Sequence, residues 1–405
     1  MNHGSDMGLV DGRKAFGGAG GGPEEPSVLF LASTLRRGGA ERALVETAVG
    51  LQENHGFRCR AGCLREEGLL GEELRERGVG ISSGLARRRL DPVGLARLKG
   101  FLSRERPHVL YMLDHRNAVL YGVPASMAAG IKRRVMAVHT MGLLGGKRSV
   151  PTSVKLMLRW IDTIVTVARG QQRYLEHSEG IPRGKMALVP NGVDVGRFRP
   201  PADQREREEA RRRLGLPPEN MAVGTLSVLR PEKGHEVFLK AAASLAGTLQ
   251  KVSFVVMGDG PERGRLEAMA KGLGLDSRVV FAGWVSDTAT ALRALDVAVM
   301  SSRPVVETAP LAALEAMATG VPLVATDVGA LRELVKDGGA GFLISSGDSD
   351  ALAKRLMALL ADEAMRKRMS QEARKTVEES FRLEDSVAAS AELLRRLALG
   401  AGGRA

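Results

Sequence analysis

The sequence is poor in aromatic residues, in cysteine and in long apolar runs. Aromatic residues make up 4% of the chain and no nucleic-acid-binding motif accompanies its net charge of +12, so nucleic acid is disfavoured as a partner. No apolar run reaches the roughly 18 residues that a membrane-spanning helix needs. The N-terminus shows no hydrophobic signal segment, so we expect the protein to be cytoplasmic.

The few residues that often bind metals are not grouped as a metal site. Cys59 and Cys63 form a C-x3-C pair, and no second pair completes a zinc site, so we expect reduced thiols near a strand. The single Asp-x-Asp, Asp348 with Asp350, opens a helical segment and is interpreted as a helix N-cap. The sequence therefore predicts no metal and no cofactor.

The length of 405 residues exceeds what one hydrophobic core usually serves, so we expect two domains. Strand-like and helix-like patterns alternate along both halves, which is typical of parallel sheets wrapped by helices. Proline, glycine and a change in polarity coincide at Pro190–Pro201. The predicted parts are a disordered Gly-rich tail (1–26), a first Rossmann-like domain (27–190), a second (191–381), and a C-terminal helix returning to the first, with a tail (382–405).

Two carboxylates, Glu307 and Glu315, lie eight residues apart beside the start of a predicted helix. Thr308 is the expected N-cap and Pro310 fits the first turn, which places Glu315 two turns into the helix, roughly 10 Å along its axis. The free N–H groups at this helix start favour an anion, and carboxylates bind hydroxyl groups. Together they suit a nucleotide sugar, although both glutamates are also compatible with plain solvated charges.

Two cations, Arg230 and Lys233, follow the first strand of the second half. At a strand's carboxyl end they are able to place two positive charges on one diphosphate. Pro231 and Gly234 shape this loop, which favours a site over ordinary surface charges.

The first half has two weaker candidates. Gly38 and Gly39 follow a short buried strand and precede a helix, which suits a loop whose N–H groups approach a phosphate, or simply a turn. His139 stands at the end of an apolar strand, where either a site histidine or a structural one is expected.

The positive charge is concentrated in one segment. Between Ile81 and Trp160 there are 15 lysines and arginines against three acidic residues. Such a segment could bind an anionic membrane surface or an anionic substrate, or it could form an ordinary solvent-exposed surface of the domain.

With these residues in view, the chain resembles the family-4 retaining glycosyltransferases, which have the GT-B architecture of two Rossmann-like domains and an interdomain cleft. The resemblance extends from about Ser27 to Leu399. It consists of motifs in a fixed order: GGAER, VHT, PNGVD, LRPEKG, VMGDGPER, VVFAGW, and E-x7-E followed by AMATGVP and TDVGALRE.

The resemblance implies a role for each matching donor-site residue. Arg230 and Lys233 match the family's diphosphate-binding pair. Glu307 matches the first Glu of E-x7-E, which contacts the donor sugar, and Glu315 the second, which binds the ribose. Backbone N–H groups near Leu311 would hold a phosphate.

Further matches concern the nucleobase and the first domain. Val285 falls where the family contacts the nucleobase through its backbone. Gly38 and Gly39 match the N-terminal phosphate loop, and His139 the histidine beside the reacting sugar. Ala168 stands where relatives often have serine, which leaves the acceptor-side contacts open.

The expected activity is therefore transfer of a hexose from a nucleoside-diphosphate sugar to an acceptor hydroxyl, without a metal and with retention taken from the resemblance. His139, Glu307, Arg230 and Lys233 are the expected catalytic residues. The expected partners are the nucleotide sugar, an acceptor lipid or glycan of cell-envelope synthesis, and an anionic membrane touched peripherally. The alternatives are a nucleotide-sugar epimerase of the same fold and a non-catalytic nucleotide-sugar binding protein.

Overall fold

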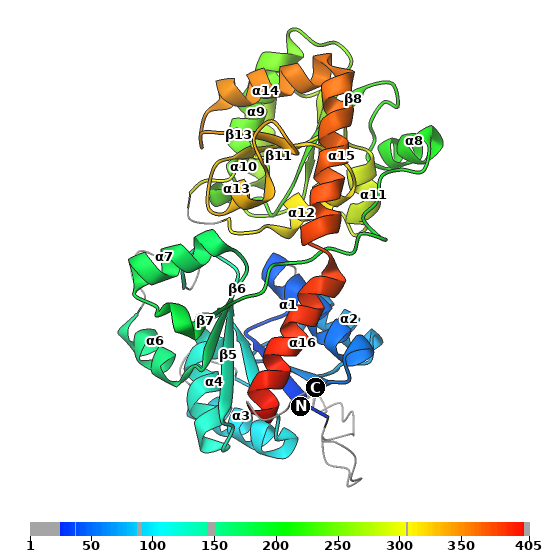
Figure 1. Ribbon diagram of the computed structural model, residues 1–405. Coiled ribbons are helices and arrows are strands. Elements are labelled where there is room, and N and C mark those ends of the chain that lie inside the picture. The colour runs from blue at the N-terminus through cyan, green and yellow to red at the C-terminus, as the bar shows by residue number, and fades with distance from the viewer. Residues whose placement is uncertain (1–24, 37, 87–90, 144–150, 305–306, 401–405) are drawn as a thin grey trace, which may run out of the picture. The chain divides into compact units, whose positions relative to one another are not determined.

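The computed structural model describes residues 25–36, 38–86, 91–143, 151–304 and 307–400 (Figure 1). The predicted disordered tail at 1–26 therefore lies outside the described residues, except for its last two positions. The chain divides into two compact units, the first comprising Met1–Met136, Pro151–Asp162 and Ala391–Ala405, the second Ala137–Val150 and Thr163–Ser390. The predicted domain boundaries stay predictions.

The first sheet has seven strands in the order β3-β2-β1-β4-β5-β6-β7. The pairs β1–β2, β1–β4, β2–β3 and β6–β7 are parallel, and β1 and β4 are buried along their whole length, as expected for strands covered on both faces. The strands are β1 (Ser27–Ala32), β2 (Arg58–Cys63), β3 (Gly80–Ser82), β4 (Val109–Leu113), β5 (Arg133–Val138), β6 (Thr163–Thr166) and β7 (Met186–Leu188). The strand order reverses between β1 and β4.

Helices connect these parallel strands (Figure 1). One example of a local signal is Asp91, whose carboxylate caps the helix that follows by accepting from the N–H of Gly94 at 2.8 Å. The helices are α1 (Gly39–Asn54), α2 (Gly68–Glu76), α3 (Pro92–Glu105), α4 (Arg116–Ala128), α6 (Thr152–Met157) and α7 (Arg169–Glu179), with single 3-10 turns at η1 (Leu158–Trp160) and η2 (Arg183–Lys185).

The second sheet has six strands in the order β10-β9-β8-β11-β12-β13, all paired in parallel. Its strands are β8 (Met221–Leu226), β9 (Val252–Met257), β10 (Val279–Gly283), β11 (Val297–Met300), β12 (Leu323–Thr326) and β13 (Gly341–Ile344). The order reverses between β8 and β11, and in open α/β sheets ligands bind beyond the carboxyl ends of the strands at such a reversal.

Four helices of the second half begin with aspartate caps. Asp203, Asp287, Asp348 and Asp362 each accept from a first-turn N–H. The predicted N-cap role of Asp348 is therefore confirmed. The helices are α8 (Gln204–Arg213), α9 (His235–Ala246), α10 (Arg263–Gly272), α11 (Thr288–Arg293), α12 (Leu311–Ala318), α13 (Leu331–Leu334), α14 (Ser349–Ala361) and α15 (Glu363–Ser380), with a 3-10 turn at η3 (Pro231–Lys233).

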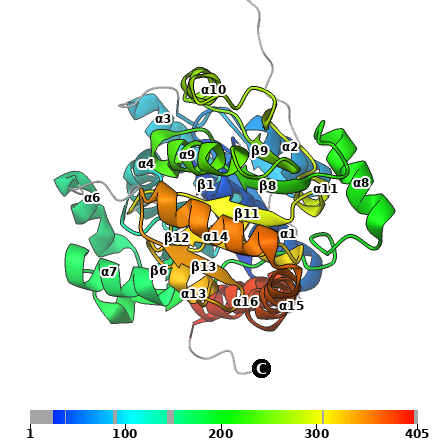
Figure 2. The ribbon, with the colours of Figure 1, turned by 90° about the horizontal axis from the view of Figure 1, so that it is seen from above.

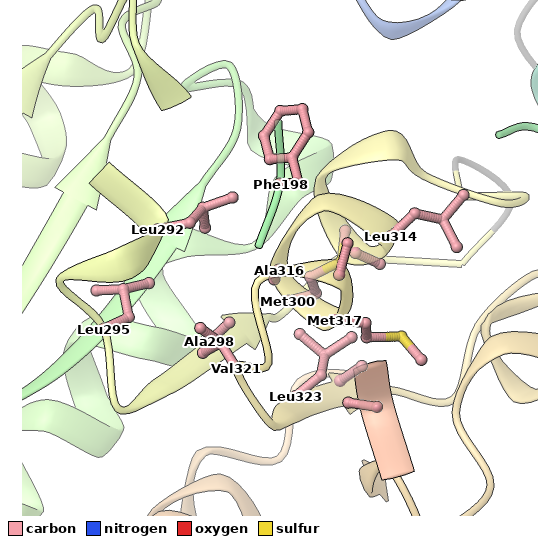
Figure 3. Close-up of a cluster of buried hydrophobic side chains, with 14 of the residues drawn as sticks. Phe198, Leu292, Leu295, Ala298, Met300, Leu314, Ala316, Met317, Val321 and Leu323 are labelled. Carbon is pink, nitrogen blue, oxygen red and sulfur yellow. The ribbon is translucent and has the colours of Figure 1, made fainter. Parts of the chain in front are cut away.

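Both faces of the second sheet are packed with apolar side chains. Successive strand residues alternate between the two cores, as the pleat requires: Phe254 packs with α9, α10 and α14, and Val255 with α11 and α12. Figure 2 shows α9 and α14 lying over the strands of this sheet. In Figure 3, Leu314 and Met317 of α12 point into the same cluster as Leu323 of β12, which anchors α12.

The chain ends in α16 (Leu383–Leu399), whose last part belongs to the first unit. There Arg395 donates to the carbonyl of His55 at 2.8 Å and lies over the ring of Phe57. Within the described residues, no helix is long and apolar enough to cross a membrane.

The predicted α/β class, with two Rossmann-like parallel sheets, is confirmed. The cysteine prediction is confirmed as well, because Cys59 and Cys63 are free, buried thiols on β2. Burial raises the pKa of each thiol to about 12.

Candidate active site

The loop between β8 and α9 lies where the strand order of the second sheet reverses, and it contains both predicted cations. Lys233 extends toward Glu307, with its Nζ 2.5 Å from Oε1 of that carboxylate. Glu307 is only 4% exposed. Burying a charged carboxylate without a partner costs free energy, and the ion pair with Lys233 offsets this cost for Glu307.

Glu307 has a second donor that the sequence argument did not identify. The hydroxyl of Ser302 donates to Oε1 at 2.7 Å, so one carboxylate oxygen accepts from both Lys233 and Ser302. Ser302 is itself buried just beyond the end of β11. The only available signal was its place directly after an apolar strand, at the sheet's carboxyl edge.

Arg230 is arranged differently. Its side chain is 60% exposed, and its guanidinium lies 3.9 Å from Glu232, which makes at most a weak surface pair. The structure therefore brings Lys233 and Glu307 together and leaves Arg230 in solvent on the same loop.

The loop is fixed against the end of β11 by backbone contact. Gly234 has a φ of +64°, and a Cβ added to it would lie 2.1 Å from the carbonyl oxygen of Ser301. The hydroxyl of Ser301 in turn donates to the carbonyl of Lys233 at 3.2 Å. Glycine is required here because both its conformation and the close approach exclude a side chain.

The next loop, after β9, packs on the first one. Gly258 has a φ of +138°, and a Cβ there would lie 1.9 Å from the carbonyl oxygen of Ser227. The N–H of Leu229 donates to the carbonyl of Asp259 at 3.0 Å. The LRPEKG and VMGDGPER motifs are thus two loops in direct backbone contact.

The start of α12 differs from the prediction. The helix begins at Leu311, and its N-cap is Pro310, whose carbonyl accepts from Ala313 and Leu314. The prediction that Thr308 is the N-cap is wrong, because the extended ψ of 130° at Pro310 delays the helix. Glu315 is therefore only four residues into the helix, roughly 6 Å along its axis rather than two turns.

The remaining donor-side residues lie at the same edge of the second sheet. Glu315 is half-buried on α12, and Leu311 is its first residue. Val285 follows β10 and packs, half-buried, against the core that anchors α12.

The other candidates belong to the first sheet. Gly38 is the N-cap of α1 and Gly39 its first residue, in extended backbone that needs no glycine at Gly38 (φ −167°). A Cβ at Gly38 would nevertheless meet the carboxylate of Glu41 at 2.1 Å. His139 follows β5 directly and is half-buried.

Comparisons with known proteins identify the family of the chain. A family model described as glycosyl transferases group 1 matches residues 206–376, and one described as Glycosyltransferase Family 4 matches residues 37–197. The chain is 31% identical over 316 residues to D-inositol 3-phosphate glycosyltransferase of Corynebacterium urealyticum, covering 72% of this chain and 74% of that one.

Two further similarities extend the comparison. A GDP-mannose-dependent alpha-(1-6)-phosphatidylinositol monomannoside mannosyltransferase of Mycolicibacterium smegmatis is 30% identical over 282 residues, covering 67% of this chain and 72% of that one. Among solved structures, Anabaena Alr3699/HepE in complex with UDP-glucose superposes with a TM-score of 0.80 at 23% identity, covering 91% of this chain and 99% of that one.

Proposed function

The chain belongs to the family-4 glycosyltransferases, and on that premise we propose that it transfers a sugar from a nucleoside-diphosphate sugar to a hydroxyl group of a lipid-linked or polysaccharide acceptor of the cell envelope. The choice of acceptor class is supported by relatives such as the UDP-Gal:alpha-D-GlcNAc-diphosphoundecaprenol alpha-1,3-galactosyltransferase of Escherichia coli. The observation on which the proposed donor site depends is the Lys233–Glu307 pair at the strand reversal of the second sheet.

Lys233 and Arg230 are proposed to bind the diphosphate. An ammonium group has three donors, so Lys233 is able to keep its bond to Glu307 and still donate to a phosphate oxygen. Arg230 adds a mobile second cation, and the first N–H groups of α12, at Leu311, add a helix dipole. Charge-assisted hydrogen bonds of this kind contribute roughly 1.5–3 kcal/mol each.

These cations act on the reaction because the diphosphate gains negative charge as the glycosidic bond breaks. Groups that bind this charge more tightly in the transition state than in the ground state lower the barrier. Glu307, held by Lys233 and Ser302, is proposed to contact the transferred sugar. Retention, with a diphosphate oxygen taking the acceptor's proton on the same face, is part of the proposal.

The remaining roles follow the family pattern. Glu315 is proposed to bind the ribose, Val285 the nucleobase through its backbone, and Gly38 and Gly39 a phosphate. His139 is proposed to stand beside the reacting sugar. With side-chain cations on the diphosphate, the reaction is proposed to need no metal, so EDTA should leave the turnover unchanged.

The proposal is tested by incubating the protein with UDP-glucose, GDP-mannose and ADP-glucose, with and without undecaprenyl-diphosphate GlcNAc. Release of nucleoside diphosphate that rises with the acceptor, together with a glycosylated lipid by mass spectrometry, supports it. Isomerised donor without nucleotide release would indicate the epimerase, and donor binding without turnover on any acceptor would indicate a binding protein.

Peripheral contact with an anionic membrane is a further part of the proposal. On the first unit, Lys132, Lys155 and Arg159 are exposed, and the apolar side chains of Met127 on α4 and Leu156 on α6 are exposed on helices that contact each other. Exposed cations beside apolar side chains suit the interface of an anionic bilayer. This would bring the enzyme to a lipid-linked acceptor.

A further inference from the structure

A buried histidine closes the loop that holds the two candidate cations. His235 is the first residue of α9, follows Gly234 directly, and is 1% exposed. Its Nε2 lies 2.9 Å from the hydroxyl oxygen of Ser227, which follows β8. One side-chain hydrogen bond thus joins the two ends of the segment 227–235, between which Arg230 and Lys233 lie.

The chemistry of this bond assigns the tautomer of the ring. Burial lowers the pKa of His235 to about 4, so the imidazole is neutral at pH 7. Its Nδ1 is buried and has no hydrogen-bond partner among the described residues. A neutral ring has one N–H, and placing it on Nε2 pairs it with Ser227 and leaves only a lone pair unpaired at Nδ1.

Both ends of this bond are fixed from outside the loop. The carbonyl oxygen of Ser227 is pressed against Gly258 of the β9–α10 loop, where a Cβ would come within 1.9 Å. At the other end Gly234 is pressed against Ser301, where the corresponding distance is 2.1 Å. These contacts restrain the backbone at each end, and the Ser227–His235 bond adds the direct side-chain link that closes the loop between the two ends.

We propose that Ser227 and His235 are positioning residues whose hydrogen bond holds the 227–235 loop in the conformation that places Lys233 on Glu307 and on the donor's diphosphate. His235 touches neither group and acts through the loop. The part of this inference that concerns the donor rests on the proposed function. The part that concerns the loop stands on the ligand-free structure.

The obvious rival is that His235 is only a core side chain, and a set of variants separates the two. In His235→Gln the amide reaches the position of Nε2 and keeps the bond, whereas in His235→Asn it reaches only that of Nδ1. Ser227→Ala removes the other partner. Phe238→Leu is the matched control for burial, because Phe238 is fully buried on the same helix, where its ring packs against that of Phe254 and makes no hydrogen bond to the loop.

The first readout is hydrogen–deuterium exchange of the ligand-free protein. We expect His235→Asn and Ser227→Ala to raise exchange in peptides covering 227–237, His235→Gln to stay near the wild type, and Phe238→Leu to leave these peptides unchanged. Unchanged exchange in Ser227→Ala and His235→Asn would overturn the proposal, as would equal increases in the Asn and Gln variants.

The second readout is the dissociation constant of UDP-glucose by calorimetry. Loss of one positioning hydrogen bond should weaken binding about fivefold or more in His235→Asn and Ser227→Ala, and no further in the double variant, since both remove the same bond. Additive losses, or wild-type affinity in both single variants, would contradict the proposed role. If the wild type does not bind UDP-glucose, the calorimetry excludes that sugar nucleotide as the donor, and hydrogen exchange decides on the loop.

Discussion

At the scale of single residues, Lys233 is the group on which the proposed chemistry depends most. Lys233→Met keeps the apolar stem but removes the cation, and removing one preorganised donor of this kind lowers kcat by roughly 10²–10³. We expect such a loss of transfer, measured as acceptor-dependent release of nucleoside diphosphate. The exposed Lys240 on α9 gives a charge-matched control. Turnover of Lys233→Met equal to that of Lys240→Met would exclude Lys233 from the reaction.

A second prediction at this scale concerns acid stability. Burial, the largest influence, together with Lys233 and Arg265, lowers the pKa of His235, while Glu236 and Glu262 raise it, and the result is about 4 against an ordinary value of 6.5. The unfolded state therefore takes up a proton first as the pH falls. The stability that neutral His235 contributes to the folded state is fully present above pH 6.5. It is lost as the pH falls toward 4, which lowers the free energy of unfolding by about 3 kcal/mol.

Urea unfolding between pH 7 and pH 4 measures this effect. The wild type should lose more stability over that range than His235→Gln, whose side chain does not titrate, and the difference between the two curves isolates His235 from the carboxylates. Parallel curves for the two proteins would contradict a neutral, buried imidazole in the folded state.

The site was only partly predictable from single residues. Lys233 and Glu307 were identified because both follow strands of a parallel sheet, at the carboxyl edge where ligands bind, and the structure places their charged groups 2.5 Å apart. Ser302 and His235 were missed, since a serine and a histidine beside an apolar run give no signal until the register of β8 and β11 brings the loops together.

At the scale of elements, the start of α12 tests how a helix is capped. Thr308 is 1% exposed, and its hydroxyl has no hydrogen-bond partner within the described part of the chain. Thr308→Val replaces the hydroxyl by a methyl of similar size, so we expect the free energy of unfolding to stay the same or to rise slightly. Loss of a true N-cap would instead cost about 0.5–2 kcal/mol.

Asp348→Ala supplies the matched comparison, because Asp348 does cap α14 through the N–H of Ala351 at 2.8 Å. It should lose about 1 kcal/mol in urea unfolding. A loss of similar size in Thr308→Val would show that this hydroxyl is bonded in the folded protein and that the helix begins earlier.

The elements that were predictable share one property, which is a strong local signal. Aspartate caps and continuous apolar strands such as VSFVVM gave their elements directly. Strands β3 and β13 have three and four residues at the edges of their sheets, which is too short for a periodic pattern to indicate them. The start of α12 was placed too early because Pro310 is compatible with both the cap and the first turn.

At the scale of the whole molecule, alternation along the chain was enough to predict two parallel sheets, and the strand orders confirm them. Each order reverses once, between β1 and β4 and between β8 and β11. The residues of the E-x7-E and LRPEKG motifs follow β11 and β8, so the second reversal explains why motifs some 75 residues apart meet. The order of the strands along the chain does not show that β8 and β11 are neighbours, because β9 and β10 lie between them in the sequence.

The uneven distribution of charge leads to the last prediction. If the first unit docks on an anionic bilayer, binding should decrease steeply with salt, because each cation near such a surface contributes about 1 kcal/mol and is screened within a Debye length. Replacing Lys132, Lys155 and Arg159 by glutamate should lower the fraction of protein that sediments with phosphatidylglycerol vesicles at 50 mM NaCl by at least tenfold.

A control variant with the same change in net charge replaces Lys367, Arg368 and Lys375, which are exposed on α15 of the second unit, by glutamate. Equal losses in the two triple variants would mean that net charge alone attracts the protein, and no sedimentation of the wild type at low salt would rule out membrane docking.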